Sequence, residues 1–298
     1  MQARKTPRVS TVADLLDAGR RRLRTSHAID HWRAAIAAED AADLLGLVLG
    51  ITADELDPDA TVPARAEVRF HQYVERRAAG EPVALIRGAV DFAGLTLLVR
   101  PGVFVPRGSS ELLARSAVAA LRRRRTARVA VDVACGAGPV TCAVARAVPG
   151  AEVWGLDIDP AAVRLARANA RRNHLANARF RVSDLLAGLP RRLRGGVAVL
   201  TIHPPYVARG EMRGLPAEIR ECEPRHTLTD GSDDGLGLVR LLTGETSEWL
   251  RPDGALLVEV APYLSRSVQG VMRRSGLHVT VLSEPGGITR VVSGVWRG

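Results

Sequence analysis

A tetrapeptide with two prolines is the most specific chemical feature of the sequence. His203-Pro204-Pro205-Tyr206 directly follows the apolar run Val197–Ile202. The prolines stiffen the backbone and remove its N–H donors, so carbonyl oxygens are left to accept hydrogen bonds from a ligand. Tyr206 can lie against a planar group. A proline turn around a buried tyrosine is the alternative, but the position after a predicted strand favours a ligand site.

A glycine-containing segment is the second candidate. Asp132-Val133-Ala134-Cys135-Gly136-Ala137-Gly138-Pro139 begins at the end of the apolar run Val129–Val133. Glycines allow the backbone to approach a ligand closely, and proline suits the first turn of a helix. Because a plain turn between a strand and a helix also uses such residues, the sequence leaves both interpretations open.

Two aspartates follow the next two predicted strands. Asp157 lies about twenty residues beyond the glycines, where an acidic side chain can accept hydrogen bonds from both hydroxyls of a ribose. The neighbouring Asp159-Pro160 can cap the following helix, which leaves Asp157 without that structural role. Asp184, after Ser183, can accept a hydrogen bond from an adenine amino group. A solvent-exposed loop aspartate is the alternative for Asp184.

An alternation of strands and helices must position these residues. It predicts an α/β fold, with a parallel sheet covered by helices on both faces and ligands beyond the carboxyl ends of the strands. Two last strands, separated by Pro285-Gly286-Gly287, predict a closing antiparallel hairpin. In chain order the predicted elements are Val129–Val133, Val140–Val148, Val153–Leu156, Ala161–Asn173, Ala178–Val182, Val197–Ile202, Leu236–Leu250, Ala255–Val260, Leu264–Arg274, His278–Ser283 and Ile288–Val295.

The first 80 residues predict a small helical domain. Thr11 can cap a helix over Val12–Arg24, and Asp30 can cap a longer one through Leu49, with Trp32 and Ile36 near its apolar face. Thr52 opens a short turn, and a helix over Ala64–Ala79 ends at Gly80-Glu81-Pro82. Three short strands follow, at Val83–Ile86, Val90–Phe92 and Leu95–Val99. We therefore expect a helical domain over residues 1–80, a β-hairpin linker over 81–105 and a ligand-binding domain over 106–298.

Composition narrows the class of protein. With 46% hydrophobic and 25% charged residues among 298, the chain is a folded globular protein rather than a disordered one. Its three cysteines, Cys135, Cys142 and Cys222, show no metal-ligand spacing. They predict a reducing compartment and no structural metal. Because no stretch approaches the roughly 18 apolar residues of a membrane span, we expect a cytoplasmic protein without a membrane partner.

The net charge of +10 raises the hypothesis of a nucleic-acid partner. Lys5 is the only lysine, and the arginines form separate runs, Arg20–Arg22, Arg122–Arg125 and Arg191–Arg194. These runs lie beside predicted helix ends or loops, where cations favour the helix C-terminus. We therefore favour the interpretation that these arginines lie at solvent-exposed helix ends, and not that they form one surface that binds an anionic partner.

At the level of motifs, the chain resembles the release-factor glutamine methyltransferases from about residue 10 onward. The tetrapeptide is similar to their Asn-Pro-Pro-Tyr motif, and further matches include Gly80-Glu81-Pro82, Val105-Pro106-Arg107, Asp234-Gly235-Leu236 and Leu257-Val258-Glu259. The resemblance implies a class I methyltransferase, with a Rossmann-like seven-stranded sheet, and S-adenosylmethionine as cofactor. It implies catalytic roles for His203, Pro204 and Tyr206, and substrate contacts for Arg107, Glu111, Pro205, Tyr206 and Glu223. The resemblance also implies that the cofactor is bound by residues after the predicted strands, namely Asp132, Ala134, Cys135, Gly136, Gly138, Asp157, Ile158, Asp184, Leu185 and His203.

The sequence also departs from the family. Ala134 replaces the first motif glycine, Gly108-Ser109-Ser110-Glu111 replaces Pro-Glu-Thr-Glu, and Leu264 replaces a glutamine. Above all, His203 stands where the family has asparagine, whose oxygen accepts a hydrogen of the substrate amide. The Nδ1 atom of a neutral histidine branches from the same position and keeps one acceptor. Histidine also adds a general base near neutral pH, which suits an acceptor that must lose a proton.

Three hypotheses about function remain at this stage. The first is methyl transfer to a nitrogen or oxygen of a release-factor-like protein or a small molecule. The second is methylation of a flipped adenine in nucleic acid, which scattered basic residues do not favour. The third is a non-catalytic protein that keeps a cofactor site. His203 is either a base or a tolerated packing substitution, and the sequence does not determine the oligomeric state.

Overall fold

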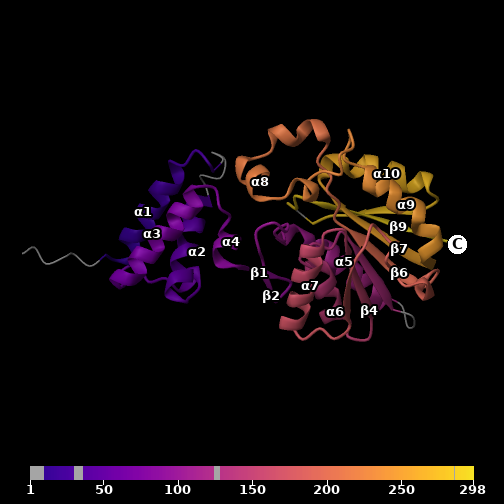
Figure 1. Ribbon diagram of the computed structural model, residues 1–298, viewed down its shortest axis with the longest axis horizontal. Coiled ribbons are helices and arrows are strands. Elements are labelled where there is room, and N and C mark those ends of the chain that lie inside the picture. The colour runs from indigo at the N-terminus through magenta and orange to yellow at the C-terminus, as the bar shows by residue number, and fades with distance from the viewer. Residues whose placement is uncertain (1–9, 30–35, 124–127, 285) are drawn as a thin grey trace, which may run out of the picture. The chain divides into compact units, whose positions relative to one another are not determined.

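The computed structural model describes residues 10–29, 36–123, 128–284 and 286–298. It divides the chain into two compact units (Figure 1). The helical unit comprises Met1–Gly88 and Leu215–Cys222, and the sheet unit comprises Ala89–Gly214 and Glu223–Gly298. The chain therefore passes between the units three times. The boundary after Gly88 lies beyond the expected residue 80, and the expected hairpin falls in the sheet unit.

The described residues of the helical unit form five α-helices: α1 (Val12–Arg24), α2 (Ala37–Leu49), α3 (Ala64–Ala78), α4 (Val83–Arg87) and α8 (Ala217–Cys222). Thr11 and Asp14 form a reciprocal capping box that starts α1, as the sequence predicts. The predicted cap Asp30 and the apolar Trp32 lie outside the described residues, so only the part of that helix from Ala37 onward is confirmed.

A buried arginine joins α8 to the rest of this unit. The Arg77 side chain is 2% exposed, and its guanidinium lies 2.7 Å from Asp40 Oδ2 and 3.0 Å from Glu218 Oε2. Removing one partner from such a buried cluster leaves an uncompensated charge in the core, which is strongly destabilising. Arg77 therefore ties a segment from late in the chain to helices from its beginning.

The predicted strand Val83–Ile86 is wrong, because these residues form helix α4. A short apolar run does not distinguish a strand from one turn of helix. Here Pro82 precedes the first helical residue and Gly88 ends the helix with φ +74°. Both are residues that suit helix ends. The next two strands are confirmed as the hairpin β1 (Ala89–Phe92) and β2 (Leu95–Leu98).

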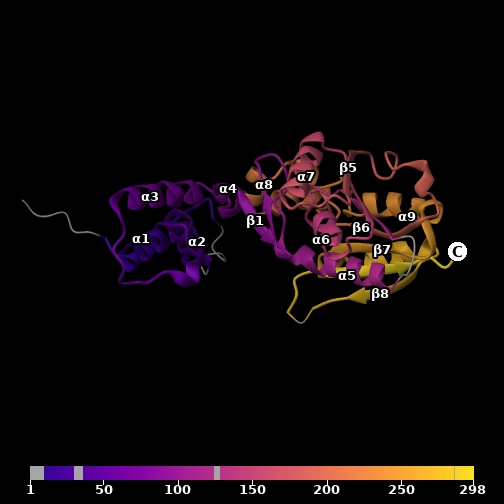
Figure 2. The same ribbon diagram turned by 90° about the horizontal axis from the view of Figure 1, so that it is seen from below.

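The sheet unit is built on a seven-stranded sheet with the order β5-β4-β3-β6-β7-β9-β8. Figure 2 labels β5, β6, β7 and β8 of this sheet. The strands are parallel except for β9, which pairs antiparallel with both β7 and β8. The predicted parallel sheet with a closing antiparallel hairpin is confirmed. The strand bounds are β3 (Val129–Val133), β4 (Glu152–Asp157), β5 (Ala178–Val182), β6 (Val197–Ile202), β7 (Leu250–Val260), β8 (His278–Leu282) and β9 (Arg290–Val295).

Helices cover both faces of this sheet (Figure 1). One buried cluster includes residues from α5, α6 and α7, and a second includes residues from α9 and α10. The strand order reverses between β3 and β6, so a crevice opens beyond their carboxyl ends. No helix in the described ranges has the length and hydropathy to span a membrane. The helix bounds are α5 (Glu111–Arg122), α6 (Pro139–Ala147), α7 (Pro160–Arg172), α9 (Gly237–Trp249) and α10 (Ser265–Arg274).

Candidate active site

A pocket lies at the carboxyl ends of β3, β4, β5 and β6, all within the sheet unit. It collects most of the residues singled out from the sequence. Those that line it are Arg107, Asp132, Ala134, Cys135, Gly136, Asp157, Ile158, Asp184, Leu185, His203, Pro204 and Pro205. Gly138, Glu111, Tyr206 and Glu223 are not among the lining residues, and each has a different position described below.

The two motif glycines have different roles in the loop after β3. Both have left-handed backbones, with φ +54° at Gly136 and +82° at Gly138. A Cβ at Gly136 would meet no atom within 4 Å, whereas one at Gly138 would lie 3.0 Å from both Ala166 and Phe180. Gly136 therefore presents bare backbone to the pocket. Gly138 instead allows α6 to pack closely.

Asp157 holds this loop through its carboxylate. Its Oδ2 accepts a hydrogen bond from the Gly136 amide at 2.8 Å, and its Oδ1 accepts one from the Asp159 amide at 2.9 Å. Burial raises the pKa of Asp157, and the two amide donors oppose the shift. The neighbouring Asp159 caps α7 by accepting from Ala161 at 2.7 Å, so the two aspartates have separate tasks.

Asp132, at the end of β3, provides a second carboxylate in the pocket, and this one is buried. Its two oxygens accept hydrogen bonds from the hydroxyls of Thr141, at 2.8 Å, and Thr201, at 2.7 Å. Burial raises the pKa of Asp132 to about 6, against the opposing effect of these bonds. A cationic group in the pocket would favour its ionised form.

A short turn presents Asp184 and Leu185 to the pocket. The Ser183 hydroxyl donates to the Leu185 carbonyl at 2.8 Å and accepts from the Gly188 amide at the same distance. Leu185 takes a left-handed backbone with φ +42°. On the other side of the pocket mouth Ile158 is 63% exposed, although it is apolar. An exposed apolar side chain beside a pocket is suited to cover a planar ligand.

Only one of the two proline carbonyls of the tetrapeptide is available to a ligand. The Pro205 oxygen accepts from the Asp230 amide at 3.0 Å, and Tyr206 forms a bridge with Thr229. The Pro204 oxygen has no hydrogen-bond partner within the described ranges. This refines the sequence-based expectation that both carbonyls are free.

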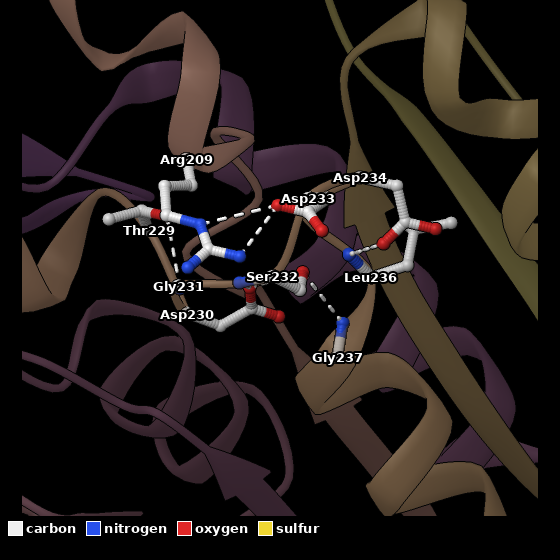
Figure 3. A network of polar contacts seen from close by, with 9 residues as sticks. All are labelled: Arg209, Thr229, Asp230, Gly231, Ser232, Asp233, Asp234, Leu236 and Gly237. Atoms are coloured by element: carbon white, nitrogen blue, oxygen red, sulfur yellow. Dashed lines mark hydrogen bonds and ion pairs between the residues drawn. The ribbon is translucent and has the colours of Figure 1, made fainter.

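A polar network in the segment Thr229–Gly237 fixes that backbone (Figure 3). Asp230 accepts from Ser232 at 2.9 Å and from Leu238 at 2.9 Å, and Arg209 pairs with Asp233 at 2.7 Å. These contacts hold Gly235, with φ +68°, against the tetrapeptide. A Cβ at Gly235 would lie 1.9 Å from the Tyr206 carbonyl oxygen. Only glycine fits there.

The His203 ring is held between aromatic neighbours. Phe104 meets it edge to face at 5.9 Å, and Tyr206 stacks on it at 5.7 Å with an angle of 26°. Its Nδ1 lies 3.2 Å from the Ser110 hydroxyl and 3.8 Å from Glu259 Oε2. Its Nε2 has no hydrogen-bond partner in the part of the chain that the structure describes. The nitrogen left for a ligand is therefore Nε2, whereas the sequence-based comparison with asparagine had pointed to Nδ1.

Arg107 lines the pocket beside this ring, and its guanidinium lies over Phe104. It pairs with Glu223 at 2.8 Å, whose other oxygen accepts from the Val105 amide at 3.3 Å. Burial raises the pKa of Glu223, and Arg107 opposes that shift. Glu111 instead points to the hairpin, where it accepts from the Ala93 amide at 2.9 Å.

Several residues of the site were missed from the sequence. Phe104, Ser110 and His226 line the pocket, and Glu259 faces His203 from the end of β7. A signal for Glu259 did exist, because it is a single carboxylate in the apolar strand end Leu256–Val260. The others lie in loops without a periodic pattern, so only the fold brings them to the pocket.

Comparison with known proteins agrees with this geometry. Residues 94–215 match the family described as the methyltransferase small domain, and residues 14–88 match the PrmC N-terminal domain. A solved methyltransferase structure from Pyrococcus furiosus has a TM-score of 0.50 at 18% identity, covering 69% of this chain and 90% of that one. Together they define a class I methyltransferase, whose cofactor is S-adenosylmethionine.

Two curated relatives narrow the class further. The release factor glutamine methyltransferase of Geobacter sulfurreducens is 35% identical over 74% of this chain and 75% of its own length. A 4-amino-L-phenylalanine/4-methylamino-L-phenylalanine methyltransferase of Streptomyces pristinaespiralis is 35% identical over 77% of this chain and 78% of its own. The chain belongs to the release factor glutamine methyltransferase family, as a divergent member with histidine in the tetrapeptide.

The pocket suits the cofactor of this class. Gly136 offers open backbone, where even a Cβ would meet nothing within 4 Å. Asp132 adds a buried carboxylate and Asp157 a half-buried one, which match an ammonium group and ribose hydroxyls. The donors and acceptors present in the pocket therefore complement S-adenosylmethionine.

Proposed function

We propose that this chain methylates a nitrogen or oxygen acceptor that must give up a proton, rather than a neutral glutamine amide. The observation that carries the proposal is the position of His203 in the acceptor tetrapeptide, with Nδ1 turned to Ser110 and Glu259 and Nε2 left for a ligand. An imidazole nitrogen can take a proton near neutral pH, which the amide of asparagine cannot do.

In this proposal the cofactor lies along the ends of β3, β4 and β5. Asp157 accepts from the ribose hydroxyls, while Asp132 and Gly136 face the methionine part. Ile158, Asp184 and Leu185 surround the adenine. Ala134 and Cys135 belong to the same loop and line the pocket, and Gly138 supports the loop by packing closely against Ala166 of α7 and Phe180 of β5. Bound there, the cofactor supplies an activated methyl group on its sulfonium.

The chain's own groups position the acceptor and remove its proton. The Pro204 carbonyl accepts a hydrogen bond from the acceptor and turns its lone pair toward the methyl group. As the new bond to carbon forms, the bond from that carbon to sulfur breaks and sulfur keeps the electron pair. The acceptor proton moves to Nε2 of His203. Catalysis is mainly positioning, because the donor is already activated.

A small aromatic amine is the acceptor class that we favour. The relative from Streptomyces pristinaespiralis is named for action on an aromatic amino acid amine, and it matches this chain as well as the glutamine-modifying relatives do. Phe104 lines the pocket and meets the His203 ring edge to face. Its ring can stack on such an acceptor. We assign acceptor recognition to the helical unit, since the cofactor residues all lie in the sheet unit.

Transfer of label from the cofactor tests this function. The full chain is incubated with methyl-labelled S-adenosylmethionine and, separately, with 4-amino-L-phenylalanine, a panel of amines and phenols, a release-factor fragment bearing a Gly-Gly-Gln loop, and DNA or RNA. Label is expected in an amine or phenol. Label only in the glutamine fragment or the nucleic acid would contradict the proposal, as would tight cofactor binding with no transfer to any acceptor.

The Asp157 assignment has its own test. Asp157→Ala is expected to weaken S-adenosylmethionine binding by about 1.5–3 kcal/mol, tenfold or more, because a charge-assisted hydrogen bond is lost. Calorimetry measures the dissociation constant. Asp159→Ala is the matched control, since it removes the neighbouring carboxylate that caps α7 and does not line the pocket. Equal S-adenosylmethionine affinities for the two variants would contradict the assignment of Asp157 to the ribose.

A further inference from the structure

The end of β7 carries a carboxylate that the proposed reaction has not yet used. Glu259 is 0% exposed, and neither of its oxygens has a hydrogen-bond partner within the described residues. Burying a carboxylate without partners is costly, so such a group calls for an explanation. Within the described part of the chain its one ion-pair contact is with His203 Nδ1, at 3.8 Å from Oε2.

Direct binding of a substrate does not explain this carboxylate. Both oxygens are closed off from the surface, and Glu259 is not among the residues that line the pocket. A ligand in the pocket would meet the His203 ring, which is 21% exposed, before it could reach the carboxylate. Glu259 can therefore influence the reaction only through the groups beside it.

The other charged and titratable groups around the ring do not take the place of a partner for Glu259. Arg107 is paired with Glu223. Burial, followed by the charge of Glu259, raises the pKa of Tyr206, which therefore remains a neutral phenol. The pKa of Tyr263 is also raised by burial. Ser110 provides a neutral hydroxyl. The imidazole is thus the one group in contact with Glu259 that can become a cation during the reaction.

We propose that Glu259 is a positioning residue that holds the proton of neutral His203 on Nδ1 and stabilises the ring when it becomes a cation. At 3.8 Å the carboxylate is beyond hydrogen-bond distance of Nδ1, but its negative charge attracts the positive end of an N–H dipole, so the tautomer with the proton on Nδ1 is favoured. The lone pair then lies on Nε2, where the pocket is. This inference rests on the proposed function, in which Nε2 takes the acceptor proton, and it gives the buried carboxylate beside the ring a role.

The tautomer of His203 can be measured without any acceptor. In the full chain labelled with nitrogen-15, ring shifts identify which nitrogen carries the proton, and loss of a signal in His203→Asn assigns it among the seven histidines. The wild type is expected to carry it on Nδ1. In Glu259→Gln the negative charge 3.8 Å from Nδ1 is removed, so the preference for a proton on Nδ1 should be lost and the Nε2 tautomer should gain population. The same tautomer in both proteins would overturn the inference.

Kinetics supply the second readout. With an acceptor from the label-transfer test, Glu259→Gln is expected to lower kcat by about ten- to a hundredfold and to leave the KM for S-adenosylmethionine within about twofold. The acidic limb of its pH–rate profile should move to lower pH, because the cationic ring loses its counter-charge. An unmoved profile with normal kcat would contradict the inference.

A merely structural carboxylate gives a different result. Glutamine has the same shape and removes a buried charge, so Glu259→Gln should melt at or above the wild-type temperature. A large loss of stability would show that the charge is structural and would overturn the positioning role. Ser110→Ala is the matched control beside the same nitrogen. It removes a neutral hydroxyl and should keep the proton on Nδ1. If label transfer fails with every acceptor while the tautomer switches as expected, the proposed function fails and the role of Glu259 in setting the ring stands.

Discussion

His203→Asn is expected to lower the rate of methyl transfer to the native acceptor by about 10²–10⁴-fold, the usual contribution of a general base. Asparagine restores an amide acceptor but cannot take a proton. A rate that depends on a general base rises with pH, and in the variant this rise should disappear. Steady-state rates measured at a series of pH values with labelled S-adenosylmethionine test both effects.

The same variant should change which acceptor is preferred. With asparagine the tetrapeptide has the form of the family motif, so a peptide with a Gly-Gly-Gln loop should become a better substrate than it is for the wild type. Cofactor affinity is measured first by calorimetry, because both outcomes require a functional pocket. A variant that binds the cofactor normally and keeps full native activity at every pH would remove the base role and leave His203 as a packing substitution.

Gly235→Ala is expected to reduce transfer by about a hundredfold or more. The added methyl group would lie 1.9 Å from the Tyr206 carbonyl oxygen, so the backbone of the tetrapeptide must move. A shift of about 1 Å in a positioned reacting group can cost about 10²-fold. The residues proposed to hold the cofactor lie on the other side of the pocket, at the ends of β3 to β5. Cofactor affinity should therefore change by less than about threefold.

Gly231→Ala is the matched control for this variant. Gly231 has φ +82° and Gly235 has φ +68°, so alanine meets the same left-handed strain, about 1–2 kcal/mol, at both positions. A Cβ at Gly231 would meet no atom within 4 Å. Rates for the two variants at equal folded fraction isolate the effect of the clash. Equal losses in both would mean that the backbone strain is responsible, and not the position of the tetrapeptide.

The centre of the sheet was predictable because its inner strands are buried on both faces. Every residue of Val197–Ile202 is buried, and the observed β6 has the predicted bounds. The helix over Leu236–Leu250 was likewise found to within one residue at each end. Val83–Ile86 was mistaken because an apolar run of that length fits a strand or a helical turn equally well. Its flanking Pro82 and Gly88 were the better signals.

The candidate site was only partly predictable. Residues directly after strands, such as Asp157 and His203, could be placed from the sequence because parallel strands end at one edge of the sheet. The ring orientation of His203 could not be placed in this way, because it depends on Ser110 and Glu259. Ser110 lies 93 positions upstream, and Glu259 lies near the end of β7, which neighbours β6 in the sheet but comes much later in the sequence. The use of the Pro205 carbonyl by Asp230 also depends on a fold of the loop that no local pattern reveals.

The helical unit is encoded by two separate segments of the sequence, because α8 belongs to this unit and yet lies within the loop that follows the tetrapeptide. Exchanging only residues 1–88 with those of a relative would replace Arg77 and leave the original Glu218 behind, although the two are in contact in the core. Recombination at Gly88 would therefore combine N-terminal helices from one protein with an α8 from another, and their buried contacts would not have evolved together. Under the proposal that the helical unit recognises the acceptor, a change of acceptor preference is expected to require paired substitutions in the N-terminal helices and α8.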